Sequence, residues 1–123
     1  SIATQELELE QLRYPIGRFH FAADSAGRFI DEWIRSIQSL PRDLAKSVEG
    51  LSAAQLDTPY RPSGWTVRQL IHHLADSHIN SYVRFRLALT EETPTIKPYD
   101  EKRWAQLSDA RSGPPEPMRP RIL

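Results

Sequence analysis

The feature that most constrains the fold of this chain is a long helical repeat of apolar residues between Thr66 and Leu89. Thr66 followed three residues later by Gln69 is a candidate capping box, which marks the start of a helix. At about 100° per residue, one side of the segment collects His78 and a set of apolar positions, namely Val67, Ile71, Leu74, Ala75, Tyr82, Phe85 and Leu89. The repeat predicts a helix over about 66–90 whose apolar side faces the core.

A second apolar repeat predicts another long helix, over about 27–49. Its apolar residues recur at intervals of three and four and are Phe29, Ile30, Trp33, Ile34, Ile37, Leu40, Leu44 and Val48. Pro41 interrupts this repeat, so we expect a kink or a break near Leu40. Gly50 is a residue type that commonly ends a helix.

Two short helices are also predicted, and together with the long ones they define an all-α fold. Ser52 with Gln55 is a second candidate capping box, for a helix near 52–56. Asp100 is a candidate cap for a helix near 100–108. We divide the chain into an N-terminal arm (1–24), a helical domain (25–110) and a proline-rich tail (111–123), where proline favours an extended or disordered chain.

Composition excludes several classes of protein. Sixteen basic and sixteen acidic residues give zero net charge, which argues against nucleic-acid binding. There is no run of 18 apolar residues, so no membrane span is expected. Without cysteine there is no disulfide framework, and the N-terminus does not have the layout of a signal peptide. We therefore expect a cytoplasmic protein.

Three of the four histidines lie on the 66–90 helix, at His72, His73 and His78. Their spacings differ from the i,i+3 and i,i+4 pairs that share a helix face, so no two of them are expected to bind one metal ion. His78 falls on the apolar side and suits the core, whereas His72 lies on the flank and suits a surface position or an interhelix contact. His73 lies on a polar strip that is either exposed or lines a cleft, and Asp76 is a candidate to orient its ring. The same polar strip also carries Ser77, Asn80 and Arg84.

Two segments of the chain carry a resemblance to a known family, namely LRYPIGRF and LDTPYRPSGWTVRQLIHHLADSHINSYVRFRLALTEETPTIKPYDEKRWAQLSD. In these segments the chain resembles the YfiT-like branch of the DinB superfamily, whose members are named putative metal-dependent hydrolases. The resemblance implies an up-down-down-up four-helix bundle that binds nickel or zinc through three histidines. One of these histidines corresponds to His73, and the other two form an HxxxH pair on a C-terminal helix. The implied activity is attack on a small molecule by metal-activated water or thiol. Some related members are thiol S-transferases of the bacillithiol type.

This chain departs from the family pattern after Asp109, where it continues as ARSGPPEPMRPRIL and contains no further histidine. We therefore expect an incomplete bundle and an incomplete metal site, with His73 as the one assigned ligand and no catalytic residue or substrate assigned. Uncovered apolar surface favours self-association, so a homo-oligomer in which a second copy completes the bundle is expected. The alternative from another class is a non-catalytic helical module for self-assembly or partner binding.

Overall fold

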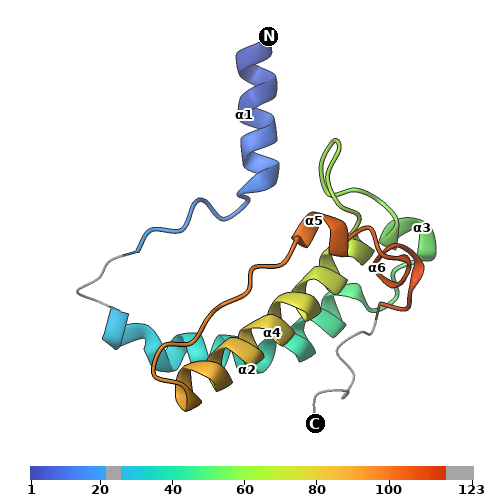
Figure 1. Ribbon diagram of the computed structural model, residues 1–123. Helices are drawn as coiled ribbons and strands as arrows, with labels where there is room; N and C mark the ends of the chain where they lie inside the picture. The colour runs from blue at the N-terminus through green and yellow to red at the C-terminus, as the bar shows by residue number, and fades with distance from the viewer. Residues whose placement is uncertain (22–25, 116–123) are drawn as a thin grey trace.

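The computed structural model describes residues 1–21 and 26–115, which form helices and connecting segments without a β-strand (Figure 1). The helices of these residues are α1 (Ile2–Arg13), α2 (Ala26–Val48), α3 (Ala53–Leu56), α4 (Val67–Thr90), α5 (Glu101–Trp104) and α6 (Ser108–Ser112). The predicted all-α fold is confirmed. One short helix was expected near 100–108, but α5 and α6 are separate because Leu107 between them adopts an extended conformation.

Both predicted capping boxes are present, and they explain where α3 and α4 begin. The Thr66 hydroxyl accepts a hydrogen bond from the Gln69 amide at 3.1 Å, and the Thr66 amide donates to Gln69 Oε1 at 3.0 Å. Ser52 and Gln55 make the same reciprocal pair ahead of α3. Each box satisfies amides that have no partner within the helix. Asp100 caps α5 by accepting from the Arg103 amide at 3.0 Å.

Of the kink or break expected near Leu40, the break is absent, because α2 continues through Pro41 to Val48, in agreement with the long helix predicted over about 27–49. Proline cannot donate to the carbonyl one turn earlier, but that carbonyl belongs to Ile37, which lies on an exposed part of the helix. Solvent can satisfy it there. Gly50 has a positive φ of 77°, so the residue expected to end α2 does have the left-handed conformation typical of helix ends.

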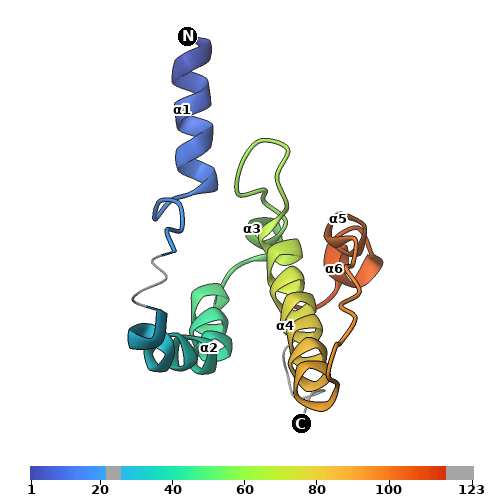
Figure 2. The ribbon, with the colours of Figure 1, turned by 60° about the vertical axis from the view of Figure 1, so that its left-hand side comes forward.

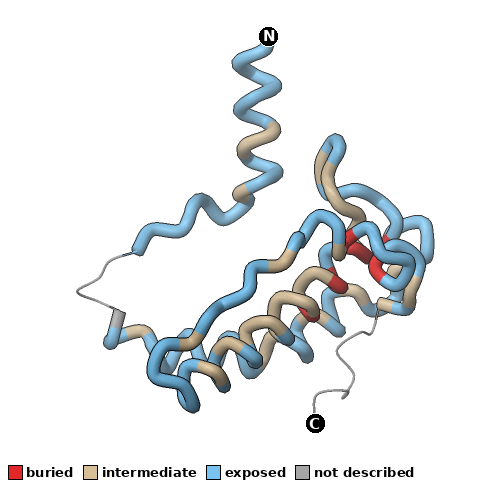
Figure 3. The backbone as a smooth tube through the Cα atoms, in the orientation of Figure 1, coloured by how far each residue is buried: buried red, intermediate tan, exposed pale blue. Residues whose placement is uncertain are grey.

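The core lies where the first half of α4 meets α3 and α6 (Figure 3). Its buried apolar side chains are Leu56, Ile71, Ala75, Ala105 and Ala110. Polar side chains are buried with them, namely Arg68, Gln69 and His72. This core is small, and alanine supplies much of it, so packing of large side chains alone does not account for how α6 is held against α4.

The prediction that the whole apolar side of α4 is buried is wrong for its second half. Ile71 is 2% exposed, but Phe85 is 72% and Leu89 is 84% exposed, and Tyr82 is exposed as well. The reason is the extent of α3 and α6, which pack against the first half of α4. Figure 2 shows that α2 lies apart from α4, so α2 does not cover this surface either.

The remaining segments lie at the edges of the described structure. α1 stands away from the other helices (Figures 1 and 2), and none of its residues is buried. Of the predicted tail, Arg111 and Ser112 belong to α6. For 116–123, the prediction of an extended or disordered tail falls outside the described residues. No helix in the described part of the chain combines the length and apolar character needed to cross a membrane.

Candidate functional site

A tight turn before α4 places an aromatic ring against His73. In this turn the Tyr60 amide donates to the Trp65 carbonyl at 3.2 Å, and Ser63 has a positive φ of 57°. At Gly64 a Cβ atom would lie 2.6 Å from Arg61 Cγ, so the chain approaches itself too closely for a side chain. The turn brings the Trp65 ring to 4.8 Å from the His73 ring, measured between centroids.

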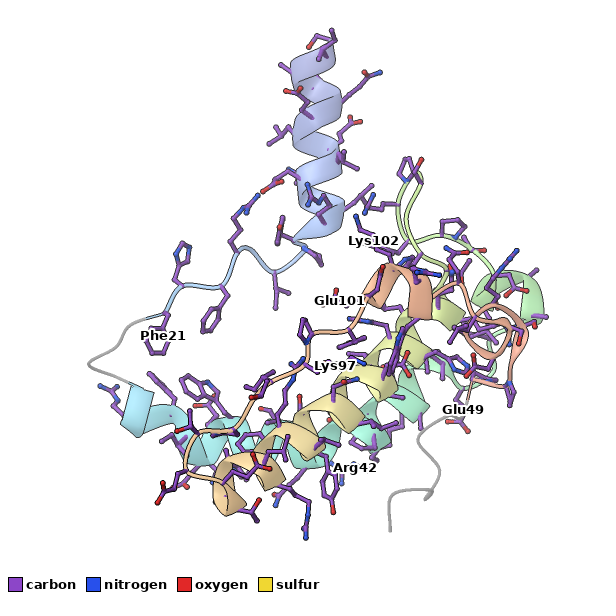
Figure 4. The ribbon with its side chains drawn as sticks, in the orientation of Figure 1. Phe21, Arg42, Glu49, Lys97, Glu101 and Lys102 are labelled. Carbon is purple, nitrogen blue, oxygen red and sulfur yellow. The ribbon has the colours of Figure 1, made fainter. Side chains whose placement is uncertain are left out.

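His73 is half-buried, and so are Ser77, Asn80 and Arg84, the other members of the polar strip. Part of the strip is covered by the chain that returns from α4 toward α5. Arg84 Nη2 lies 3.4 Å from the Lys97 carbonyl, and Figure 4 labels Lys97 on this returning segment. The strip is therefore neither fully exposed nor part of the apolar core. Half-burial leaves room for a ligand to approach while partly excluding water.

Three polar side chains at the start of α4 bind backbone carbonyls of the segment that contains α5 and α6. Arg68 Nη1 donates to Gly113 O at 2.7 Å, Gln69 Nε2 donates to Ala105 O at 2.7 Å, and His72 Nε2 lies 3.0 Å from Pro114 O. We call Arg68, Gln69 and His72 the polar clamp. These bonds satisfy carbonyls that would otherwise be partly desolvated without a donor, and each such loss is unfavourable. The clamp therefore holds α6 against α4 where few large apolar residues are available.

Arg68 is the best-connected member of the polar clamp. Its Nε also donates to Asp57 Oδ1 at 2.8 Å, so its charge is paired although the side chain is buried. Asp57 follows α3, and the pair joins α3 to α4. Gly113, whose carbonyl accepts from Arg68, has no room for a side chain, because a Cβ there would collide with the Asp109 carbonyl.

Asp76 lies one turn after His73 and is half-buried. Burial raises the pKa of the Asp76 carboxyl above its usual 3.8, and the negative charge of Asp109 raises it further. The nearby imidazoles of His72 and His73 act in the opposite direction on this pKa. Asp76 thus belongs to the same electrostatic environment as His73, and no hydrogen bond joins the two among the described residues, so its role in orienting His73 stays a prediction.

Tyr99, on the returning segment, adds an aromatic side to this environment. Its ring packs against that of Trp104 in a tilted arrangement, with the centroids 4.7 Å apart. Partial burial is the largest cause that raises the pKa of the Tyr99 phenol, and the negative charges of Glu101 and Asp76 contribute in the same direction. Figure 4 labels Glu101 on α5. The Ser77 side chain of the polar strip also acts on the Tyr99 pKa, through a hydrogen bond that lowers it, so Tyr99 lies beside the strip.

The other histidines differ in part from what was predicted. Of the two positions expected for His72, the surface position is wrong, because His72 is buried. Its Nε2 contacts the segment just after α6 and must donate, because the Pro114 carbonyl can only accept. His78 was assigned to the core, yet it is half-buried rather than enclosed. His20, interpreted as structural because it lies between Phe19 and Phe21, is exposed. The histidine-rich helix thus has three different environments.

A divalent metal requires about three or four donors around one ion. Among the described residues, no group of three histidine, cysteine, aspartate or glutamate side chains is arranged to hold a metal. His73 is suited to be one donor, because no hydrogen bond to another described residue occupies its ring nitrogens. The described residues therefore provide one imidazole and do not by themselves form a metal centre.

A surface hollow of about 730 Å³ lies along α5. It is lined by Asp100, Lys102, Arg103, Trp104, Gln106 and Leu107. All of these residues come from one short stretch of chain, and His73 and Asp76 are not among them. The hollow therefore does not enclose the polar strip.

The sequence did not predict the polar clamp or the contact between the Trp65 and His73 rings. The clamp acceptors are backbone carbonyls, 36 to 45 residues away from their donors, and any residue type can supply them. One partial signal for the clamp was present in the sequence, namely the polar residues Arg68, Gln69 and His72 at the start of a helix that was predicted to pack against the core. Polar side chains in such a position need partners.

Comparison with known proteins places the chain in a family. The DinB superfamily model matches residues 31–120. A Bacillus mycoides (strain KBAB4) protein named "Putative metal-dependent hydrolase" is 53% identical over 103 residues, covering 84% of this chain and 60% of the relative. A Bacillus cereus (strain B4264) protein with the same description is 54% identical over the same shares of the two chains.

The solved structure of YfiT from Bacillus subtilis, described as a probable metal-dependent hydrolase with an unusual four-helix bundle topology, is 51% identical to this chain. It matches with a TM-score of 0.78, over 85% of this chain and 60% of that one. The chain thus spans about 60% of the length of these relatives. The predicted resemblance and the bundle fold are confirmed, and the chain belongs to the DinB superfamily.

Proposed function

We propose that this chain contributes to a metal-dependent hydrolase that acts on a small molecule, and that His73 is the metal donor it supplies. The names of the relatives support the activity. The observation that carries the assignment to this chain is the environment of His73. Its ring is held by Trp65, lies half-buried on the polar strip and makes no hydrogen bond with another described residue.

Nickel or zinc is the proposed metal. Imidazole is a favourable ligand for both ions, whereas magnesium and calcium prefer oxygen donors. The remaining donors are not found among the described residues, so the proposal assigns one ligand and leaves the rest of the coordination sphere to other groups. In this assignment Asp76 is a positioning residue, one turn away from His73.

The donor assignment can be tested by NMR on the imidazole groups of the 123-residue chain. Paramagnetic Ni²⁺ added below stoichiometric amounts should broaden the His73 ring signals before those of the other histidines. His20 is the control for an exposed imidazole, His78 for a half-buried one, and His72 for a ring whose Nε2 is already bonded. Diamagnetic Zn²⁺ should shift the same His73 signals.

Two outcomes would count against His73. Broadening at His20 equal to that at His73 would indicate general binding to exposed imidazole. Broadening at His20 or His78 with none at His73 would remove His73 as the donor. The hydrolase activity is tested separately by measuring hydrolysis of small-molecule ester and amide probes with and without a chelator. Activity that is unaffected by the chelator would contradict a metal-dependent reaction.

A further inference from the structure

Among the described residues, the His73 ring lacks the hydrogen bond that usually orients a metal-binding imidazole. Rotation of an imidazole about its last side-chain bond has only a broad preference. A ring that binds a metal is therefore normally oriented by a hydrogen bond from its other nitrogen to a carboxylate, a carbonyl or water. His73 makes no such bond with another described residue, and its aromatic neighbour is Trp65, with ring centroids 4.8 Å apart and ring planes tilted by 52°. The orientation of the ring therefore depends on packing, to which Trp65 contributes directly.

The backbone holds Trp65 in place on both sides. Within the turn, the Tyr60 amide donates to the Trp65 carbonyl at 3.2 Å. Next to the turn, the Val67 amide donates to the Thr58 carbonyl, also at 3.2 Å. Figure 1 shows the loop between α3 and α4 running directly into α4, the helix that carries His73. Because one turn and one helix connect the two rings, the position of Trp65 relative to His73 is set by local structure.

Gly64 allows the turn to close tightly enough to place Trp65 there. A Cβ atom at Gly64 would lie 2.6 Å from Arg61 Cγ, 3.1 Å from the Arg61 carbonyl oxygen and 3.2 Å from Tyr60 Cε1. The Arg61 side chain is itself held, because its Nε donates to the Tyr60 hydroxyl at 3.0 Å. A methyl group at Gly64 would therefore displace the turn, and Trp65 with it, since Trp65 is the next residue.

We propose that the turn at 60–65 is a positioning device for His73, in which the close approach at Gly64 places the Trp65 ring against the imidazole and the Trp65 ring sets its orientation. Trp65 has here the role that a hydrogen-bonded carboxylate or carbonyl has at many metal sites. It is a positioning residue, because it acts through His73. The consequence for metal binding rests on the proposed function, whereas the orientation of the ring does not require a metal.

The orientation is tested on the metal-free 123-residue chain by NMR relaxation of the His73 ring carbons, which reports how freely the ring moves. The ring should be ordered in the unchanged chain and mobile in Trp65→Met, whose flexible side chain fills space without fixing a ring. Trp65→Phe should keep most of the order. Gly64→Ala should act like Trp65→Met although the tryptophan remains. Gly27→Ala is the matched control, since a Cβ at Gly27 meets nothing within 4 Å.

The His72 ring shows whether each variant keeps its fold. It is buried on the same helix, and its Nε2 lies 3.0 Å from the Pro114 carbonyl, so it should stay ordered throughout. If one variant also loses the order of His72, its fold has changed and the other variant decides. A His73 ring that is mobile in the unchanged chain would overturn the proposal. Equal order of His73 in the unchanged chain, Trp65→Met and Gly64→Ala would overturn it as well.

Zn²⁺ binding tests the consequence for the proposed function. The Zn²⁺ concentration that half-shifts the His73 ring signals should rise about threefold to tenfold in Trp65→Met and Gly64→Ala, because a mobile ring loses more freedom when it binds. Trp65→Phe and Gly27→Ala should stay within about twofold of the unchanged chain. Equal concentrations throughout would overturn the assignment of Trp65 as a positioning residue and leave His73 as the donor. No Zn²⁺ response of His73 in the unchanged chain would instead contradict the donor assignment, and the ring order measured without metal would still decide the role of Trp65.

Discussion

The first half of α4 and the whole of α2 differ in a way that amphipathicity alone does not predict. α2 has the more regular apolar stripe, yet none of its described side chains is buried. The start of α4 carries arginine, glutamine and histidine among its apolar residues, and it forms the core. The difference is the presence of a partner, because α3 and α6 pack against α4.

This comparison shows that a short segment can be fixed by backbone hydrogen bonds when it has little apolar surface to bury. α6 has five residues and one buried side chain, Ala110. The polar clamp compensates by binding the carbonyls of Ala105, Gly113 and Pro114. The same part of α4 presents His73 and Asp76, so the candidate site is built on the best-held part of the molecule.

The largest expected contrast is between matched isoleucines on the two helices. Ile71→Ala should lower the free energy of unfolding by about 2–5 kcal/mol, because it leaves a cavity in the core. Ile37→Ala, at a position 61% exposed, should change it by less than about 0.5 kcal/mol. Urea unfolding at low micromolar concentration, where association contributes least, measures both. Similar losses at the two positions would mean that α2 is packed within the single chain.

The next contrast uses the two capping-box glutamines. Gln69→Ala should cost about 2–3 kcal/mol, because it removes a cap and leaves the buried Ala105 carbonyl without its donor. Gln55 has the same role in the exposed box of α3, and Gln55→Ala should cost less than about 1 kcal/mol. The pair separates the contribution of the clamp from that of the cap. If both variants unfold at the same urea concentration, the bond to Ala105 adds nothing.

A smaller effect is expected for His72 and its partner Pro114. His72→Phe keeps an aromatic ring but loses the donor to the Pro114 carbonyl, and it should cost about 1–2 kcal/mol. His78→Phe, which removes a half-buried imidazole outside the clamp, should change stability by less than about 0.5 kcal/mol. Thermal unfolding of the two variants gives the comparison, and an equal loss would exclude a special role for His72.

The smallest effect concerns Asp76, and its sign depends on pH. Burial and Asp109 raise the pKa of Asp76 in the folded state, so the folded state binds this proton more tightly than the unfolded state does. Stability contributed by this group therefore falls as pH rises from 3.8 through the raised pKa. Asp76→Asn should be slightly more stable than the unchanged chain at pH 7, and its advantage should vanish below pH 3.8. A variant that is less stable at pH 7 would contradict this.

Much of the fold could be predicted because its signals are local. Thr66 with Gln69, Ser52 with Gln55, and Gly50 are short-range features that define where helices begin or end, and all three behave as predicted. The burial of the second half of α4 was predicted wrongly because an apolar stripe shows which side can be buried, not which segment covers it. The helix is also unbroken at Pro41 for a related reason, since an exposed helix tolerates a carbonyl without its donor.

The candidate site was less accessible to sequence reasoning. The role of His73 as a metal donor came from the family resemblance, because its spacing from His72 and His78 predicts no shared ion. The position of Trp65 against His73 depends on the turn at Gly64, where the close approach of Arg61 could not be foreseen from residue types. The burial of His72 could not be foreseen for the same reason, since its acceptor is the backbone of Pro114.

The most direct test of the central claim is amide hydrogen exchange along the 123-residue chain at low micromolar concentration. If the polar clamp and the small core hold the first half of α4 while α2 is uncovered, amides of Ile71 to Asp76 should be the most protected. Amides of α2 should exchange much faster, because exposed helices open locally at little cost. Protection of α2 equal to that of α4 in the monomer would contradict the account.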